Sequence, residues 1–149
     1  MKGIRTTAAG LEIGNDVTCP FCGDAAELTD GVGVYGTSAV GKPYATKSFY
    51  VCRPCDARVG CHPGTTKPLG DLADVTTREA RMRAHAAIDP AWTRLAEYGA
   101  ISRTKARRIV YSRLSRLLGI PSDRCHVAMM DVEMCERAVA VAPFLCVTP

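Results

Sequence analysis

The order of apolar and polar residues differs between the two halves of the chain. In the first half, residues 47–51 are rich in aromatic and β-branched side chains and predict a strand, and residues 25–29 and 57–61 predict two more. The glycine-rich stretch at 31–41 lies between the first two of these strands and predicts a turn. The first half therefore predicts a β-hairpin with a third strand.

After a loop rich in Pro, Gly and Thr at 62–70, the spacing of apolar residues becomes helical. Thr76, with Glu79 three residues later, matches a capping box and predicts a helix that runs to about residue 88. Asp89 and Pro90 are expected to end this helix, because proline is tolerated at the first position of a following helix. The segment 76–98 thus predicts two short helices.

The clearest helical pattern follows Ser102, whose side chain is of a type that caps helix N-termini. It stops at Gly119 and Pro121, as helix C-termini commonly do. A last helix is predicted near residues 128–142. The apolar stripe of the Ser102 helix is expected to face the core and comprises Ala106, Ile109, Val110, Leu114, Leu117 and Leu118.

Two Cys-x-x-Cys pairs, separated by 29 residues, are the strongest chemical signal in the chain. Four thiolates suit a tetrahedral zinc ion, and a closed set of four protein ligands leaves no position for a substrate. A redox pair is disfavoured because no βαβ pattern surrounds either motif, and four unrelated buried thiols are the remaining alternative. The pattern predicts one structural Zn²⁺ held by Cys19, Cys22, Cys52 and Cys55.

These patterns together predict an α+β fold with a small N-terminal zinc ribbon, made of a β-hairpin plus a third strand, followed by a compact bundle of about four helices. The expected parts are an N-terminal arm at 1–16, the zinc ribbon at 17–62, a connecting loop at 63–75, a helical domain at 76–142 and a tail at 143–149.

The remaining cysteines and the histidines allow two interpretations. Adjacent Cys-His pairs occur twice, and a third histidine lies on the first predicted helix, so a second metal site is chemically possible. Adjacent side chains usually point to different sides of the chain, which favours the alternative that the thiols pack as small apolar groups. The candidates for this second polar or metal cluster are Cys61, His62, His85, Cys125 and His126.

Charge is unevenly distributed. The net charge of the whole chain is +4, but residues 76–118 contain ten Lys and Arg against three Asp and Glu, a net charge of +7. Such an excess is typical of a surface that binds polyanions, and a solvated helix surface is the alternative. The candidate nucleic-acid-binding residues are Arg103, Lys105, Arg107, Arg108, Arg113 and Arg116.

Several classes of protein are disfavoured by what the sequence contains. No apolar run is long enough to span a membrane, and the first residues are not followed by the apolar stretch of a signal peptide, so we expect a cytoplasmic protein. No P-loop, dinucleotide-binding glycine pattern or serine-nucleophile motif is present. The sequence therefore favours a binding protein over an enzyme.

Several longer motifs are also specific, such as Cys19-Pro-Phe-Cys22-Gly23, Cys52-Arg-Pro-Cys55-Asp56 and Cys125-His126-Val-Ala-Met-Met-Asp131. Through these motifs the chain resembles, over about residues 17–137, a phage and bacterial family of zinc-finger-containing domains of unknown function. The resemblance implies a zinc site and a phage setting, and hence the cytoplasm of a bacterial host cell.

Three functions follow as hypotheses. The first is a zinc-binding, phage-type accessory protein that binds DNA or RNA through its basic helical face, with possible base stacking on Tyr35, Tyr44, Phe49 and Tyr50. These aromatic residues could instead form the core of the hairpin. The second hypothesis is a protein-interaction module that binds and modulates a host protein. The third, an enzyme using a second metal at the histidines, has the least support.

Overall fold

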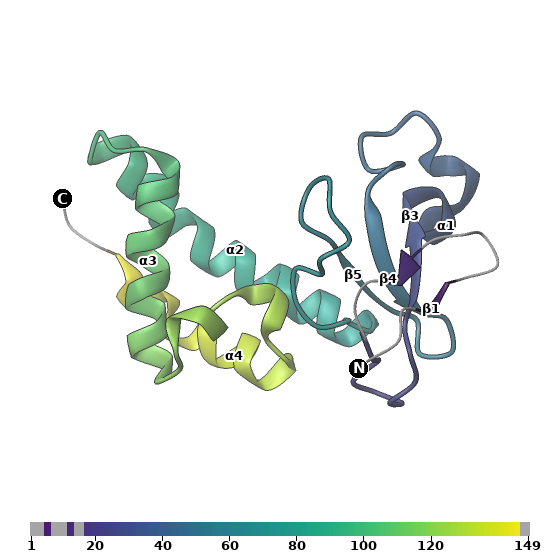
Figure 1. Ribbon diagram of the computed structural model, residues 1–149. Helices are drawn as coiled ribbons and strands as arrows, with labels where there is room; N and C mark the ends of the chain where they lie inside the picture. Colours follow the sequence, from purple (N-terminus) through teal and green to yellow (C-terminus); the bar gives the residue numbers. More distant parts are fainter. Residues whose placement is uncertain (1–4, 7–11, 14–16, 147–149) are drawn as a thin grey trace. The chain divides into compact units, whose positions relative to one another are not determined.

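The structure, a computed structural model, describes residues 5–6, 12–13 and 17–146. The chain divides into two units, Met1–Val75 and Thr76–Pro149, which we describe separately. The first contains an antiparallel sheet and the four-cysteine cluster, and the second is helical (Figure 1). The predicted α+β class is thereby confirmed. The arm predicted at 1–16 lies largely outside the described residues, apart from the short antiparallel pair β1 (Arg5–Thr6) and β2 (Glu12–Ile13).

The sheet of the first unit has the strand order β3-β4-β5 and is antiparallel throughout. Its strands are β3 (Glu27–Asp30), β4 (Ser48–Cys52) and β5 (Ala57–Gly60), close to the three that the sequence predicts. Tyr50 in the central strand pairs with Leu28 on one side and Val59 on the other. These three side chains are buried on one face of the sheet and form its core with Ala57 and Leu72.

The glycine-rich segment between β3 and β4 is more ordered than predicted. Instead of a turn alone, it forms a short helix, α1 (Gly31–Tyr35), followed by a 3₁₀-helix, η1 (Gly36–Ala39). The Asp30 side chain caps α1 by accepting a 2.8 Å hydrogen bond from the Gly33 amide. Gly31 packs directly against the Tyr44 carbonyl, where any side chain would collide. The glycines of this segment therefore permit close packing as well as chain reversal.

The segment after β5 folds back along the sheet. Isolated bridges join Cys61 to Pro68 and Arg58 to Ala73, and the Tyr50 hydroxyl donates a 2.8 Å hydrogen bond to the Thr66 carbonyl. The buried phenol therefore has a partner, and the segment closes one end of the ribbon core.

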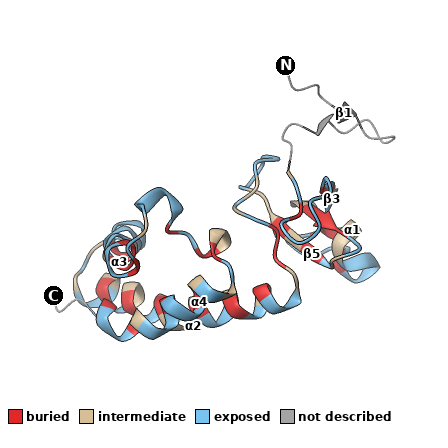
Figure 2. Cartoon of the chain, turned by 90° about the horizontal axis from the view of Figure 1, so that it is seen from below, coloured by how far each residue is buried: buried red, intermediate tan, exposed pale blue. Residues whose placement is uncertain are grey.

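The helical unit contains α2 (Val75–Tyr98), α3 (Arg103–Leu118) and α4 (Val132–Val141). Short 3₁₀-helices connect or extend them: η2 (Ser122–Arg124), η3 (Val127–Met129) and η4 (Ala142–Leu145). Buried positions form stripes along the helices, as the red segments in Figure 2 show. None of the helices that the structure describes has the length and apolar character needed to cross a membrane.

The prediction of two helices over 76–98 is wrong, because α2 is continuous and contains Pro90. A proline inside a helix costs about 3 kcal/mol. The buried face of α2 passes Pro90 without interruption, since Ala84, Ile88, Ala91 and Leu95 keep helical spacing, and Pro90 itself is exposed. Packing of this continuous face outweighs the local cost. The helix also begins at Val75, which places Thr76 inside it instead of at its cap.

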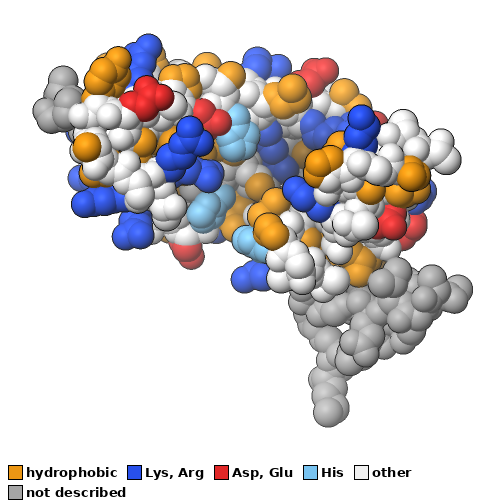
Figure 3. Space-filling view, turned by 90° about the horizontal axis from the view of Figure 1, so that it is seen from above, with side chains coloured by type: hydrophobic (Ala, Val, Ile, Leu, Met, Phe, Trp, Pro, Cys, Tyr) orange, Lys and Arg blue, Asp and Glu red, His pale blue; other side chains and the backbone are white. Residues whose placement is uncertain are grey.

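The predicted Ser102 helix is confirmed as α3. The Ser102 hydroxyl accepts a 3.2 Å hydrogen bond from the Lys105 amide, and Gly119 ends the helix with a φ of 67°. Most of the predicted apolar stripe is buried, but Ile109 and Leu117 are 37% and 42% exposed, so their assignment to the core is wrong. Apolar side chains (orange) accordingly lie among charged ones on the surface in Figure 3.

The last helix is shorter than predicted. The span 128–142 contains α4 only from Val132, because the Asp131 carboxylate accepts a 2.8 Å hydrogen bond from the Met134 amide and caps the helix there. The preceding residues form η3. The buried residues of α4, Cys135 and Ala138, join the same core as the buried residues of α2 and α3.

Candidate metal centre

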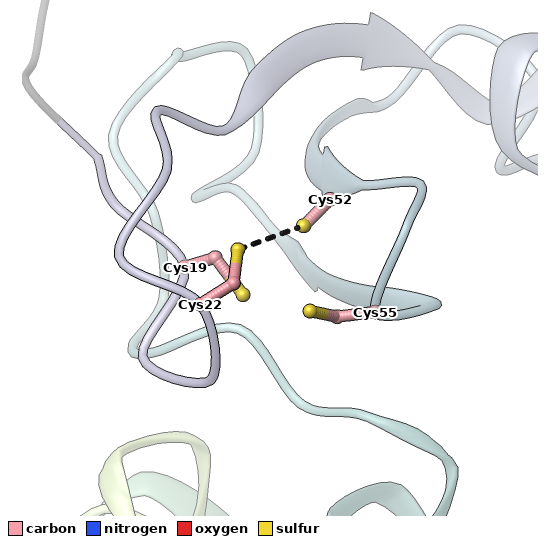
Figure 4. A group of neighbouring side chains, drawn as sticks. All are labelled: Cys19, Cys22, Cys52 and Cys55. Carbon is pink, nitrogen blue, oxygen red and sulfur yellow. Dashed lines mark hydrogen bonds between the residues drawn. The ribbon is translucent and has the colours of Figure 1, made fainter.

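Two turns position the four cysteines of the first unit. Cys19 and Cys22 lie in the turn before β3, where the Gly23 amide donates a 2.8 Å hydrogen bond to the Cys19 carbonyl and Gly23 has a φ of 80°. Cys52 is the last residue of β4, and Cys55 lies in the tight turn that leads to β5. Pairing of β4 with β3 brings the two turns to the same end of the sheet (Figure 4).

The sulfur atoms have the geometry of a zinc site. All four Sγ atoms lie within 4.8 Å of one another, and those of Cys22 and Cys52 are 3.7 Å apart. A tetrahedron with Zn–S bonds of about 2.3 Å has edges of about 3.8 Å. The four side chains point toward a common centre in Figure 4. The residues therefore fit one zinc ion with a complete set of four thiolate ligands.

The electrostatics of the cluster call for a cation. The pKa of the Cys55 thiol is raised from 9.0 to about 12, first because it shares a hydrogen bond with Cys22, then through desolvation and the other two cysteines. Crowded thiols resist joint ionisation because each new negative charge is repelled by the others. A bound zinc ion supplies the compensating charge and joins the two turns. With four protein ligands the site is closed, so the zinc is structural.

The sheet, the two cysteine turns and the closed four-thiolate site define a zinc-ribbon protein with a helical extension. The sequence profile of a family described as a zinc-finger-containing domain matches residues 15–143. The chain belongs to this family. No curated protein and no solved structure shows significant similarity to it.

The second predicted cluster includes residues from both units, and its members are described here within each unit. In the ribbon, Cys61 is half-buried and His62 is exposed. In the helical unit, His85 Nδ1 lies 3.7 Å from an Asp89 carboxylate oxygen, one turn along α2. Within the residues that the structure describes, the four-cysteine group is the only set of three or more potential ligands brought together. A second metal site therefore stays a prediction.

Cys125 and His126 differ in environment although they are adjacent. Cys125 is 1% exposed and its thiol donates a 3.7 Å hydrogen bond to the Tyr111 carbonyl, whereas His126 is exposed. Burial raises the pKa of the Cys125 thiol to about 11. The Cys125 side chain thus packs in the helical core as a neutral group, as the alternative interpretation of the sequence expects.

One residue of the metal centre was missed in the sequence. Arg53 stands between the ligands Cys52 and Cys55, and its guanidinium forms hydrogen bonds of 3.2 and 3.3 Å with Glu27 on the neighbouring strand. It also donates to the Gly33 carbonyl of α1. Opposite charges at 27 and 53 are visible in the sequence, but only the strand register shows that they meet. Arg53 therefore ties the second cysteine turn to α1.

The buried thiol at Cys125 leads to a pH prediction. Its folded pKa lies above the ordinary value of 9.0, so the neutral form stabilises the fold below pH 9 and this contribution is lost as pH rises through about 11. We expect about 2–3 kcal/mol of the stability of the helical unit to disappear over this range. Denaturant unfolding under reducing conditions should show a flatter pH dependence in Cys125→Ala, with zinc content unchanged.

The matched control for this prediction is Cys146→Ala, which removes an exposed thiol from the same unit. It should unfold with the same alkaline pH dependence as the parent protein. Equal slopes in the parent and in Cys125→Ala would contradict the assignment of Cys125 as a buried neutral group.

Proposed function

We propose that this protein binds nucleic acid through the exposed face of α3. The observation that carries the proposal is the charge of this helix, which has six basic residues and no acidic one over its length. Helices that need only be soluble usually mix charges, because opposite charges four residues apart stabilise them. An unmixed positive helix repels itself, and a bound polyanion relieves that repulsion.

Three of the four basic side chains of α3 that make no other contact within the described residues share one face of the helix. Lys105, Arg108 and Arg116 are exposed and lie at i, i+3 and i+11, which places them along one side of the helix over about 16 Å. The opposite side of α3 contributes the buried residues and faces α4 and η4. Lys and Arg side chains stand out from the helical unit in Figure 3.

Acidic residues do not neutralise this face. Within residues 17–146 none of the six basic side chains of α3 forms an ion pair, although α4 carries Glu133 and Glu136 and is capped by Asp131. Two of the six have other contacts: Arg107 lies over the Trp92 ring at 5.4 Å, and Arg113 donates to the Cys146 carbonyl at 3.3 Å. The remaining positive charges support contacts with phosphates. Such contacts do not distinguish one base sequence from another.

The biological setting belongs to the same proposal. The family resemblance supports an accessory protein of phage type that acts in the cytoplasm of a bacterial host, with DNA or RNA as the partner. The zinc ion would then hold the ribbon in shape and take no part in chemistry.

A second candidate function is a protein-interaction module that binds a host protein. It is favoured by the apolar side chains that interrupt the basic surface, since Ile109 and Leu117 on α3 and Phe144 on η4 are 37%, 42% and 69% exposed. Protein interfaces commonly combine exposed apolar groups with arginine.

Charge reversal on α3 tests the first proposal. We expect Arg108→Glu combined with Arg116→Glu to weaken binding to a mixed-sequence oligonucleotide at least tenfold at about 50 mM salt, with the zinc content and helical circular dichroism of the parent. Raising salt from about 50 to 200 mM should weaken parent binding about 40-fold if three phosphates are contacted. The slope of the logarithm of the binding constant against the logarithm of the salt concentration should be smaller in magnitude by about 2 in the double variant.

The matched control is Arg94→Glu combined with Arg124→Glu, which changes net charge equally at exposed positions outside α3. It should retain most of the binding. Equal losses in the two double variants, or no binding by the parent at low salt, would overturn the assignment of α3. Salt-resistant binding of a host protein that Leu117→Ser abolishes would favour the second candidate.

A further inference from the structure

An aromatic cluster on the ribbon is not explained by the zinc site or by α3. The rings of Tyr35 and Tyr44 meet edge to face with centroids 5.2 Å apart, and those of Tyr35 and Phe49 meet edge to face at 5.9 Å. The Arg58 guanidinium lies over the Tyr35 ring at 5.1 Å. These residues come from α1, the segment after η1, β4 and β5. The fold therefore assembles one aromatic surface from four parts of the ribbon.

This cluster is not part of the ribbon core. Tyr35 and Tyr44 are 41% and 36% exposed, whereas Tyr50 is fully buried and its hydroxyl is hydrogen-bonded. The hydroxyls of Tyr35 and Tyr44 have no hydrogen-bond partner in the part of the chain that the structure describes. Aromatic rings that contact one another but remain open to water offer a stacking surface.

Several contacts hold this surface rigid. Asp30 caps α1, and Arg53 donates hydrogen bonds of 3.4 Å to the Gly33 carbonyl. Gly31 lies against the Tyr44 carbonyl, which fixes the segments that carry Tyr35 and Tyr44 against each other. A rigid site loses less conformational entropy when a ligand binds.

The charge beside the rings is positive. Lys42 and Lys47 flank Tyr44 in one turn, where the Ala45 amide donates to Lys42 and the Lys47 amide donates to Tyr44. Both lysines are exposed and form no ion pair within residues 17–146. The nearby carboxylates are already engaged: Glu27 pairs with Arg53, Asp56 pairs with Arg58 at 3.8 Å, and Asp30 accepts the capping hydrogen bond of α1.

We propose that Tyr35, Tyr44 and Phe49 form a stacking platform for an unpaired base of single-stranded nucleic acid, with Lys42 and Lys47 contacting the adjoining phosphates. A free base presents an aromatic face that a duplex hides, and each base stacked on an aromatic side chain contributes substantially to single-strand affinity. A basic peptide would be repelled by the two lysines, and an acidic one would leave the rings unused. The inference does not depend on α3, which lies in the other unit.

The test uses the full-length, zinc-loaded protein with a fluorescein-labelled 12-mer of deoxythymidine and a hairpin duplex of mixed sequence, followed by anisotropy. We expect Tyr35→Leu combined with Tyr44→Leu to weaken single-strand binding at least tenfold and duplex binding less than twofold. Tyr35→Phe combined with Tyr44→Phe keeps the rings and should bind the single strand like the parent. The α3 substitutions Arg108→Glu and Arg116→Glu are then added to both the Leu and the Phe variants. The Leu variant should still bind the single strand more weakly than the Phe variant by the same factor, which separates this site from α3.

Zinc content shows whether each variant retains the ribbon. If the Leu variant loses zinc, Lys42→Glu combined with Lys47→Glu serves in its place, because both side chains are exposed. It should also lower single-strand affinity at least tenfold. Single-strand binding within twofold of the parent in a folded Leu or Glu variant would overturn the proposal, and so would equal losses for single strand and duplex. The proposal would also be overturned if this surface bound an acidic peptide and did not bind the oligonucleotide.

Discussion

Replacing Cys22 by serine is expected to remove zinc from the protein and unfold the ribbon. Serine leaves three thiolates in a site whose four sulfur atoms lie within 4.8 Å of one another. Structural zinc sites have apparent binding free energies of about 10–16 kcal/mol, and much of this is folding free energy. Elemental analysis should give one zinc per chain in the parent and almost none in Cys22→Ser, with rapid tryptic cleavage within residues 17–75.

Two controls sharpen this experiment. Cys146→Ser removes an exposed cysteine outside the cluster and should keep both zinc and protease resistance. Cys22→His offers zinc another ligand of a suitable type and should recover part of the metal content. Full zinc occupancy and an intact ribbon in Cys22→Ser would contradict the four-thiolate site.

The helical unit should respond equally strongly to a cavity in its core. Leu114 on α3 is fully buried, and Leu114→Ala is expected to cost about 2–5 kcal/mol of unfolding free energy. Leu117→Ala on the same helix removes a side chain that is 42% exposed and should cost less than about 1 kcal/mol. Denaturant unfolding followed by far-ultraviolet circular dichroism measures both changes.

Zinc content should be unchanged in Leu114→Ala, since the buried residues of the ribbon and of the helical unit form separate clusters. Loss of zinc in this variant, or equal destabilisation by the two leucine substitutions, would contradict the separation of the two cores.

The sequence predicted best those features that depend on short-range chemistry. The cysteine spacing specifies four zinc ligands because few other structures require two such pairs. The sequence correctly predicted that α3 begins after Ser102 and ends at Gly119, because capping depends on residues adjacent in the chain. The strand at β4 was visible because aromatic and β-branched residues favour a pleated surface.

The features that could not be predicted from the sequence depend on packing between distant segments. Gly31, the first residue of α1, lies against the Tyr44 carbonyl, and the pattern of the glycine-rich segment does not show that contact. The continuity of α2 through Pro90 depends on a buried face completed by α3 and α4. The exposure of Ile109 and Leu117 likewise depends on how much of α3 its neighbours cover. Local propensity is a weak guide wherever tertiary packing opposes it.

Because the zinc ligands lie on two turns, the ribbon should tolerate changes in the length of the segment that joins these turns. The ion closes a loop of 29 residues between Cys22 and Cys52, and the entropy of closing a flexible loop depends only on the logarithm of its length. Inserting a dozen residues between Gly36 and Lys42 would raise that cost by about 0.3 kcal/mol. The same insertion inside either cysteine turn would separate two adjacent ligands. The entropy of loop closure therefore limits the length of the hairpin tip far less than the zinc ligands limit the length of the two cysteine turns.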